Sequence, residues 1–159
     1  MKKIVLAIAL AVCTLGANAQ VWMGGSLGLN VTKNKVIDDT NTTFTIAPEV
    51  GYSLNDNWDV ALGLGYSTDS KAFSIKPYAR YTFAQLGSVG FFVDGGIDYT
   101  TKIDEFWIGL RPGIKFAASD KITLVAHLGS FGYVTNDAAS NFGLNINNSA
   151  LSFGMYWAF

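Results

Sequence analysis

The chain has 159 residues, of which 50% are hydrophobic, 14% are charged and seventeen are glycine, and its formal net charge is −1. This composition excludes an intrinsically disordered chain, and the length suits a single domain. The weak acidic balance argues against a nucleic-acid partner.

Residues 1–19 have the pattern of a secretory signal peptide. Two lysines precede an apolar run over 4–12, and the small-residue triplet Ala-Asn-Ala at 17–19 predicts cleavage after it. The run is too short for a membrane helix, which needs about 20 apolar residues. Cys13 raises lipoprotein processing as an alternative, which the valine before it fits poorly. Because Cys13 is the only cysteine, the mature chain, residues 20–159, is predicted to hold neither a disulfide nor a thiol site.

The mature chain alternates apolar and polar residues with a period of two, which predicts strands and no helix of useful length. Short turns alternate with longer polar connections, of which 33–42 and 134–148 are the longest. This is the pattern of an outer-membrane barrel, and an even number of strands places both termini on the short-turn side. The predicted strands are 21–32, 43–54, 58–67, 73–83, 89–100, 106–117, 122–133 and 149–159.

One parity of these strands is apolar and uncharged, whereas the other is rich in glycine and carries four acids and four bases. A soluble, lipocalin-like barrel would turn the apolar face inward. Small residues and balanced charges suit a narrow interior instead, since a buried ion needs a partner, and large aromatics near the strand ends suit a membrane interface. We therefore expect the charged parity to form a salt-bridge network in the lumen: Glu49, Asp59, Lys76, Arg80, Asp94, Asp98, Arg111 and Lys115.

Three strands repeat a proline two residues after Ile or Leu and four residues before an aromatic: Pro48, Pro77 and Pro112. Proline removes a ladder donor and is normally tolerated only at a sheet edge or a bulge. Because a closed barrel has no edge, local bulges are expected at these three positions.

The chain ends in "LSFGMYWAF", in which Leu151, Phe153, Met155, Trp157 and Phe159 share one side of a strand. This ending resembles the C-terminal signature of outer-membrane barrels, which the barrel assembly machinery recognises. With the signal peptide and the eight strands, it resembles the outer-membrane β-barrel domain family of OmpX, Ail and the OmpA barrel, often labelled porin-like. The resemblance implies a monomer in the lipid of the outer membrane of a Gram-negative cell.

The resemblance also implies a role in surface adhesion, host-factor binding or envelope integrity. Such functions belong to extracellular loops, so any external ligand is expected at 33–42 and 134–148. No catalytic, metal or cofactor-binding residues are predicted, and the chain is expected not to be an enzyme. Asp38 and Asp39 are interpreted as solvated loop charges.

Three alternatives stay open at this stage. A lipid A-modifying enzyme would use His127, the only histidine, with a serine such as Ser130 and an acid; a hydrogen-bonded lumen histidine is the favoured interpretation. A narrow channel would use the lumen charges, although eight strands leave an interior that side chains fill. A soluble ligand-binding barrel is the most remote alternative.

Overall fold

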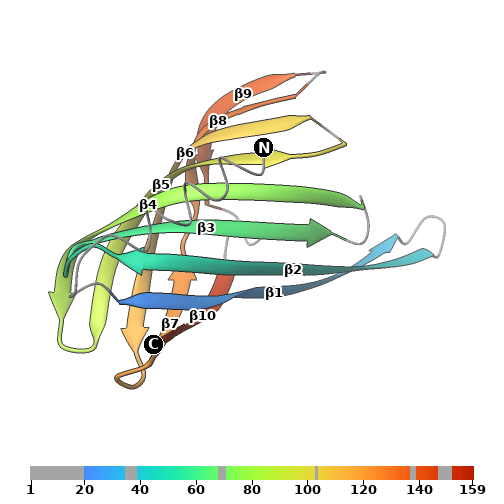
Figure 1. Ribbon diagram of the computed structural model, residues 1–159. Helices are drawn as coiled ribbons and strands as arrows, with labels where there is room; N and C mark the ends of the chain where they lie inside the picture. The colour runs from blue at the N-terminus through green and yellow to red at the C-terminus, as the bar shows by residue number, and fades with distance from the viewer. Residues whose placement is uncertain (1–19, 35–38, 68–70, 103, 137–138, 147–151) are drawn as a thin grey trace, which may run out of the picture.

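The computed structural model in Figure 1 describes residues 20–34, 39–67, 71–102, 104–136, 139–146 and 152–159, with the backbone alone for 27–34, 39–45 and 67. Within this part of the chain, no helix has the length and apolar character needed to cross a membrane. The strands are β1 (Val21–Asn34), β2 (Asp39–Ser53), β3 (Trp58–Ser67), β4 (Ala72–Leu86), β5 (Val89–Thr100), β6 (Glu105–Ala117), β7 (Ile122–His127), β8 (Ser130–Thr135), β9 (Ser140–Asn145) and β10 (Ser152–Ala158).

The strands form a closed ring in which every pairing is antiparallel. β1 to β6 follow one another, β7 and β8 both pair with β6, and β10 joins β7 to β1. β7 and β8 follow each other along one position of the barrel and together count as its seventh strand. β9 and β10 likewise count as its eighth strand. The predicted fold class, an eight-stranded antiparallel up-and-down barrel, is therefore confirmed.

The predicted strand 122–133 is interrupted at Leu128 and Gly129. His127 lies opposite Gly113 of β6, but Phe131 lies opposite Leu110, so β7 and β8 together carry one more residue than the strand beside them. Gly129 has a φ of +157°, which a side chain disfavours, and the Leu128 N–H donates to the Pro112 carbonyl over 2.9 Å. The extra residue reverses the parity, so that odd-numbered residues face the lumen in β7 and the outside of the barrel in β8.

The two long loops are shorter than predicted, because strands occupy most of them. β1 and β2 extend over 33–34 and 39–42, and β8 and β9 cover 134–135 and 140–145. Outside the strands, Asn136 and Ala139 form a tight turn in which the Asn136 N–H donates to the Ala139 carbonyl over 3.0 Å. Residues 35–38, 137–138 and 147–151 lie outside the described part of the chain.

The expected bulges at the three prolines are only partly correct. Toward the preceding strand, Pro48 pairs in register with β1 and Pro77 pairs in register with β3. Toward the following strand, the ladder at each proline lacks two residue pairs, and its register does not change. Only Pro112 faces a bulge, the one at Leu128–Gly129, while a register shift in β4 occurs at Phe83. Each gap lies toward the next strand, where the missing N–H would have donated.

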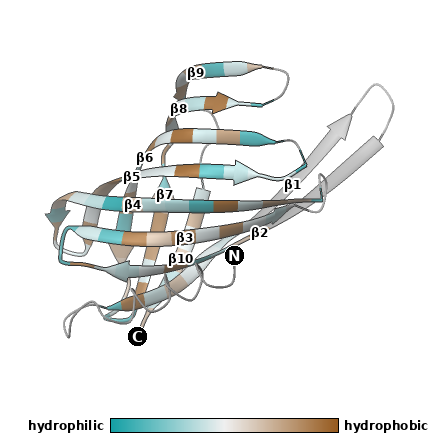
Figure 2. Ribbon diagram, turned by 45° about the horizontal axis from the view of Figure 1, so that its top comes forward, coloured by the Kyte–Doolittle hydropathy of each residue, from teal (hydrophilic) through white to brown (hydrophobic). Residues whose placement is uncertain are grey.

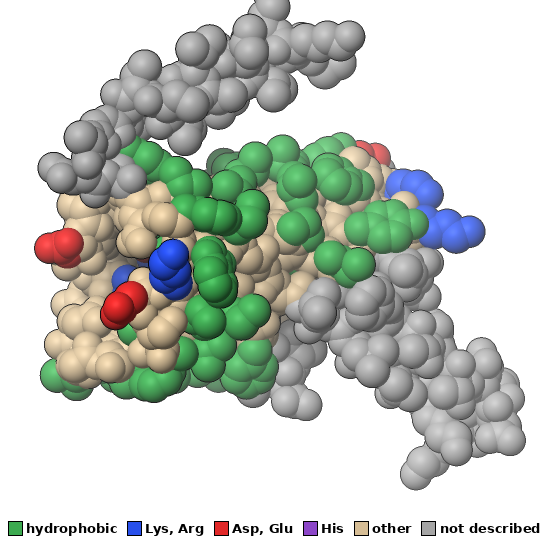
Figure 3. Space-filling view, turned by 60° about the horizontal axis from the view of Figure 1, so that its bottom comes forward, with side chains coloured by type: hydrophobic (Ala, Val, Ile, Leu, Met, Phe, Trp, Pro, Cys, Tyr) green, Lys and Arg blue, Asp and Glu red, His purple; other side chains and the backbone are tan. Residues whose placement is uncertain are grey.

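Apolar and polar residues alternate along the strands, as the brown and teal bands in Figure 2 show, and the apolar parity is the exposed one. Leu62, Leu110 and Leu124 are 36%, 47% and 45% exposed, and Figure 3 shows hydrophobic side chains over much of the face in view, with charged side chains nearer the two ends. Tyr52 departs from this pattern, since it shares the outward parity but is buried. The four described residues of the predicted assembly signature are exposed, while Leu151 lies outside the described residues: Phe153, Met155, Trp157 and Phe159.

Candidate functional site

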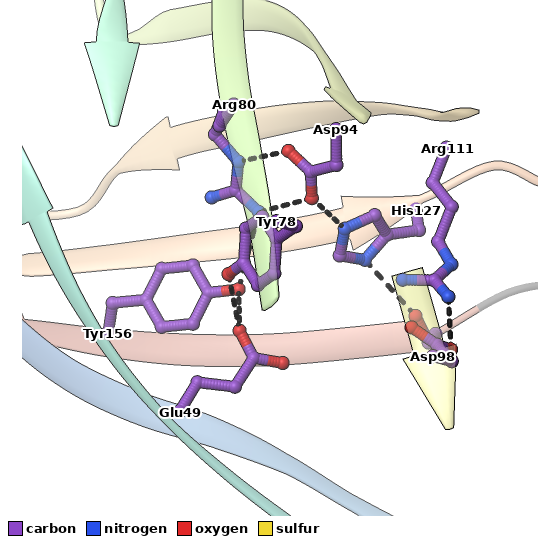
Figure 4. Close-up of polar contacts among 9 residues, drawn as sticks. Glu49, Tyr78, Arg80, Asp94, Asp98, Arg111, His127 and Tyr156 are labelled. Carbon is purple, nitrogen blue, oxygen red and sulfur yellow. Dashed lines mark hydrogen bonds and ion pairs between the residues drawn. The ribbon is translucent and has the colours of Figure 1, made fainter. Parts of the chain in front are cut away.

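The centre of the lumen is built around Arg80 on β4 and Asp94 on β5, which lie directly opposite each other in the ladder. The Arg80 Nε donates to Asp94 Oδ1 over 2.7 Å and its Nη2 to Oδ2 over 2.8 Å (Figure 4). Both residues are 2% exposed. The guanidinium also lies 4.0 Å from the centroid of the Phe92 ring, so a charged group is enclosed by a carboxylate and an aromatic face.

His127 extends this pair toward β10. Its Nε2 lies 2.8 Å from Asp94 Oδ2, and its Nδ1 lies 3.2 Å from the Ser152 hydroxyl oxygen. An edge-to-face contact with Phe92, 5.4 Å between centroids, holds the imidazole ring. The sequence placed His127 in the lumen and suggested Ser130 as its partner. Because β10 pairs with β7, the partner is Ser152 instead.

Among the residues that the structure describes, tyrosines and not a cation hold Glu49 on β2. The Tyr78 and Tyr156 hydroxyls donate to Glu49 Oε2 over 2.7 and 2.9 Å, and Arg80 Nη2 donates to the Tyr156 oxygen over 3.4 Å. Tyr156 also packs on Trp22, with ring centroids 4.3 Å apart. The hydrogen-bonded chain thus runs without interruption from Glu49 through Arg80 and Asp94 to Ser152.

The other predicted lumen charges form separate groups. Arg111 donates to Asp98 Oδ2, and Lys76 Nζ lies 3.7 Å from the same oxygen, while the Arg111 guanidinium stacks 4.1 Å from the Trp107 ring centroid. The Asp59 carboxylate accepts from the Ser53 hydroxyl over 2.6 Å.

Lys115 has no ion pair among the described residues. It lines a pocket of about 180 Å³ together with Asp59 and Arg80. The eight predicted charges therefore share one interior without forming one continuous ion-pair network.

The residues that sequence reasoning missed are neutral donors. No hydrogen-bonding role was predicted from the sequence for Tyr78, Tyr156, Ser53 or Ser152. All four have the lumen parity of their strands, which is the one signal that could have found them. The described residues contain no group of three or more His, Cys, Asp or Glu side chains arranged to hold a metal ion.

Comparison with known proteins identifies the family. The family model described as "Outer membrane protein beta-barrel domain" matches residues 4–159. The chain belongs to this family. Neisserial surface protein A (NspA), in its crystal structure, is similar to this outer-membrane β-barrel protein with a TM-score of 0.55 and 16% identity over 90% of this chain and 98% of that chain.

A designed protein has the same fold. A structure titled "De novo design of transmembrane beta-barrels" is similar with a TM-score of 0.57 and 12% identity, over 88% of this chain and 95% of that chain. At these identities the likeness shows the fold alone. No curated protein sequence matches this outer-membrane β-barrel protein.

Proposed function

We propose that this protein is a small, non-enzymatic outer-membrane barrel that acts through its extracellular surface, in envelope integrity or in binding a surface partner. The observation that carries the proposal is the occupied lumen. Arg80, Phe92 and Asp94 are at most 2% exposed, and Trp22 and Tyr156 beside them are 7% and 6% exposed. An interior filled by paired side chains leaves the outer surface as the part that can meet a partner.

The same proposal covers biogenesis. Residues 1–19, which lie outside the described part of the chain, would be removed on export, and the barrel assembly machinery would read the signature that ends at Phe159. The protein would then function as a monomer in the outer membrane, without a cofactor. A ligand would be met at 33–42 and 134–148, where Asn136, Ala139 and Ile146 are the described residues that lie outside the strands.

The channel alternative has little support in the lumen. A conducting path would have to pass the bidentate Arg80–Asp94 pair and the Tyr78 and Tyr156 hydroxyls on Glu49, all of which are satisfied by one another. Opening that path would strand buried charges, which is costly. The pocket of about 180 Å³ inside the described part of the barrel is lined by Asp59, Arg80 and Lys115, which does not suit the acyl chain that an acyltransferase holds.

The serine-hydrolase alternative has little support in the electrostatics around Asp94. Ser152, His127 and Asp94 form a nucleophile–base–acid series by distance. In a working triad, however, the carboxylate stabilises the imidazolium that forms when the base takes the serine proton. Here the Asp94 charge is already compensated by two hydrogen bonds from Arg80, so it can give little to His127.

We expect that a fluorophosphonate probe will label the purified, folded barrel no more than it labels Ser152→Ala, because the Asp94 carboxylate beside His127 is already held by Arg80. Labelling is measured by in-gel fluorescence, with a known serine hydrolase as the positive control. The lipid A mass spectrum of cells carrying His127→Ala should match that of the wild type. Labelling that disappears in Ser152→Ala would instead make the protein a hydrolase.

The proposed function is tested by complementing a deletion strain. One variant replaces 136–139 with Gly-Ser-Gly-Ser, and its matched control makes the same change in the opposite turn, 118–121. Detergent sensitivity and adherence are scored for both, with gel mobility of unboiled samples as the check on folding. Loss confined to the 136–139 variant supports a surface role; a deletion that alters only lipid A or solute uptake contradicts it.

A further inference from the structure

A polar pocket lies inside the barrel, near the end that carries the short turns. Its volume is about 180 Å³, and its lining includes the charged residues Asp59, Arg80 and Lys115 and the neutral polar residues Gln20, Ser53 and Thr123. One water molecule takes about 30 Å³ in the liquid, so the pocket has room for a small organic molecule. Gln20 is exposed, so the pocket is reached from this end, which in outer-membrane barrels faces the periplasm.

Lys115 on β6 supplies a positive charge to the pocket. A side chain at Gly90, which faces Lys115 in the ladder, would meet the lysine Cγ and Cε at 2.9 Å. The lysine therefore lies across β5 on the inner side of the wall, where it is half-buried. Among the described residues, Lys115 makes no ion pair. Its ammonium group is thus available to a negatively charged group inside the pocket.

Arg80 adds a second donor to the same pocket. Its Nε and Nη2 donate to Asp94, and Nη2 also donates to the Tyr156 oxygen. The remaining nitrogen, Nη1, has no acceptor among the described residues, and no dashed line reaches it in Figure 4. Arg80 is only 2% exposed and lines the pocket, and an unpaired buried donor is costly. An acceptor inside the pocket would satisfy it.

Asp59 on β3 supplies the opposite charge. It faces Arg80 in the β3–β4 ladder, but the Arg80 guanidinium bonds Asp94 instead. Asp59 is 9% exposed, its Oδ1 accepts from the Ser53 hydroxyl over 2.6 Å, and its Oδ2 has no donor in the described part of the chain. The pocket therefore presents a carboxylate oxygen and two cationic donors that do not satisfy one another.

We propose that this pocket binds a small zwitterion of the α-amino acid class, with its carboxylate on Lys115 and Arg80 and its ammonium on Asp59. The charges of these three residues and Asp94 sum to zero, so a ligand that is neutral overall leaves no net charge in the lumen. A simple anion would meet the Asp59 carboxylate, and a simple cation would meet Lys115 and Arg80. Electrostatic complementarity thus selects a ligand that carries both charges. The site is independent of the surface role proposed above.

The test is a titration of the purified, folded, ¹⁵N-labelled barrel in detergent micelles, followed by the amide resonances of Asp59, Lys115 and Thr123. The probes are glycine, which carries both charges, acetate, which carries the carboxylate alone, and methylammonium, which carries the cation alone. The three titrations are made at the same neutral pH and ionic strength. Unboiled gel mobility verifies that each sample holds a folded barrel.

We expect saturable shifts with glycine at a concentration about ten-fold or more below the concentration that acetate or methylammonium needs, because only glycine makes charge-assisted hydrogen bonds at both sides of the pocket. Glycine shifts that do not saturate would overturn the proposal, since the pocket would then hold only water. Acetate that saturates at the same concentration as glycine would also overturn it, because the site would then be a simple anion site.

Two variants separate the charges, and a third is their matched control. Lys115→Met should remove the glycine response, whereas Asp59→Asn should reduce the affinity for glycine to that for acetate. Lys121→Met changes a lysine in the turn at the same end of the barrel, outside the pocket, and should leave the glycine titration unchanged. A loss in Lys121→Met as large as in Lys115→Met would contradict a site built by the pocket residues.

Discussion

Replacing Arg80 with alanine is expected to lower the free energy of unfolding of the barrel by about 3–5 kcal/mol, because the Asp94 carboxylate would be left buried without its main partner. The pair is buried to 2% exposure and makes two hydrogen bonds of 2.7 and 2.8 Å. Urea unfolding in lipid vesicles, followed by tryptophan fluorescence, measures the effect.

Two further variants show whether the loss comes from the stranded charge. Arg80→Met/Asp94→Leu removes both charges and should recover most of the stability, since replacing a whole buried pair by apolar residues is often neutral. Arg111→Ala should cost only about 1 kcal/mol, because Asp98 keeps Lys76 nearby and the Arg111 side chain is 23% exposed. Equal losses for Arg80→Ala and Arg111→Ala would argue against a central role for the Arg80–Asp94 pair.

Leu110→Arg is expected to destabilise the protein in lipid vesicles by about 2–4 kcal/mol, the cost of an arginine on the lipid face near the bilayer midplane. Leu110 is 47% exposed and lies near the middle of β6. In a soluble barrel the same change at an exposed position would be almost neutral. The experiment therefore tests directly what the outer face contacts.

Leu86→Arg is the matched control for Leu110→Arg. Leu86 is 70% exposed and ends β4 beside a short turn, where a membrane interface would cost an arginine about 0–1 kcal/mol. A loss at Leu110 no larger than at Leu86 would contradict a bilayer around the middle of the wall.

The fold could be predicted from the sequence because a period of two, interrupted by turns, leaves few alternatives for a chain this apolar. Local irregularities were not predictable in the same way. One additional residue at Leu128–Gly129 reverses the parity above it, and nothing in the alternation of 122–133 marks the place. Residues 140–145 were interpreted as loop because asparagine and serine outnumber the two large apolar residues, Phe142 and Leu144.

The site was predictable in its members and less so in its contacts. Parity placed the eight charges on one face, but which charges meet depends on the register between strands that are distant in sequence. Arg80 and Asp94 meet because β4 and β5 are paired at that level. Glu49 instead meets Tyr78 of β4 and Tyr156 of β10, because side chains from strands that are not neighbours in the sheet meet inside the lumen.

The Glu49 contact has a mechanical consequence. Hydrogen bonds from Tyr78 and Tyr156 to Glu49 connect β2 to β4 and to β10. Neither strand pairs directly with β2, because β3 lies between β2 and β4 and β1 lies between β2 and β10. A wall joined only by neighbouring hairpins can be pulled from a membrane one hairpin at a time. Because these hydrogen bonds join strands through the lumen, removing any one of β2, β4 and β10 loosens the other two. The barrel therefore resists force as a unit and yields in fewer, larger steps.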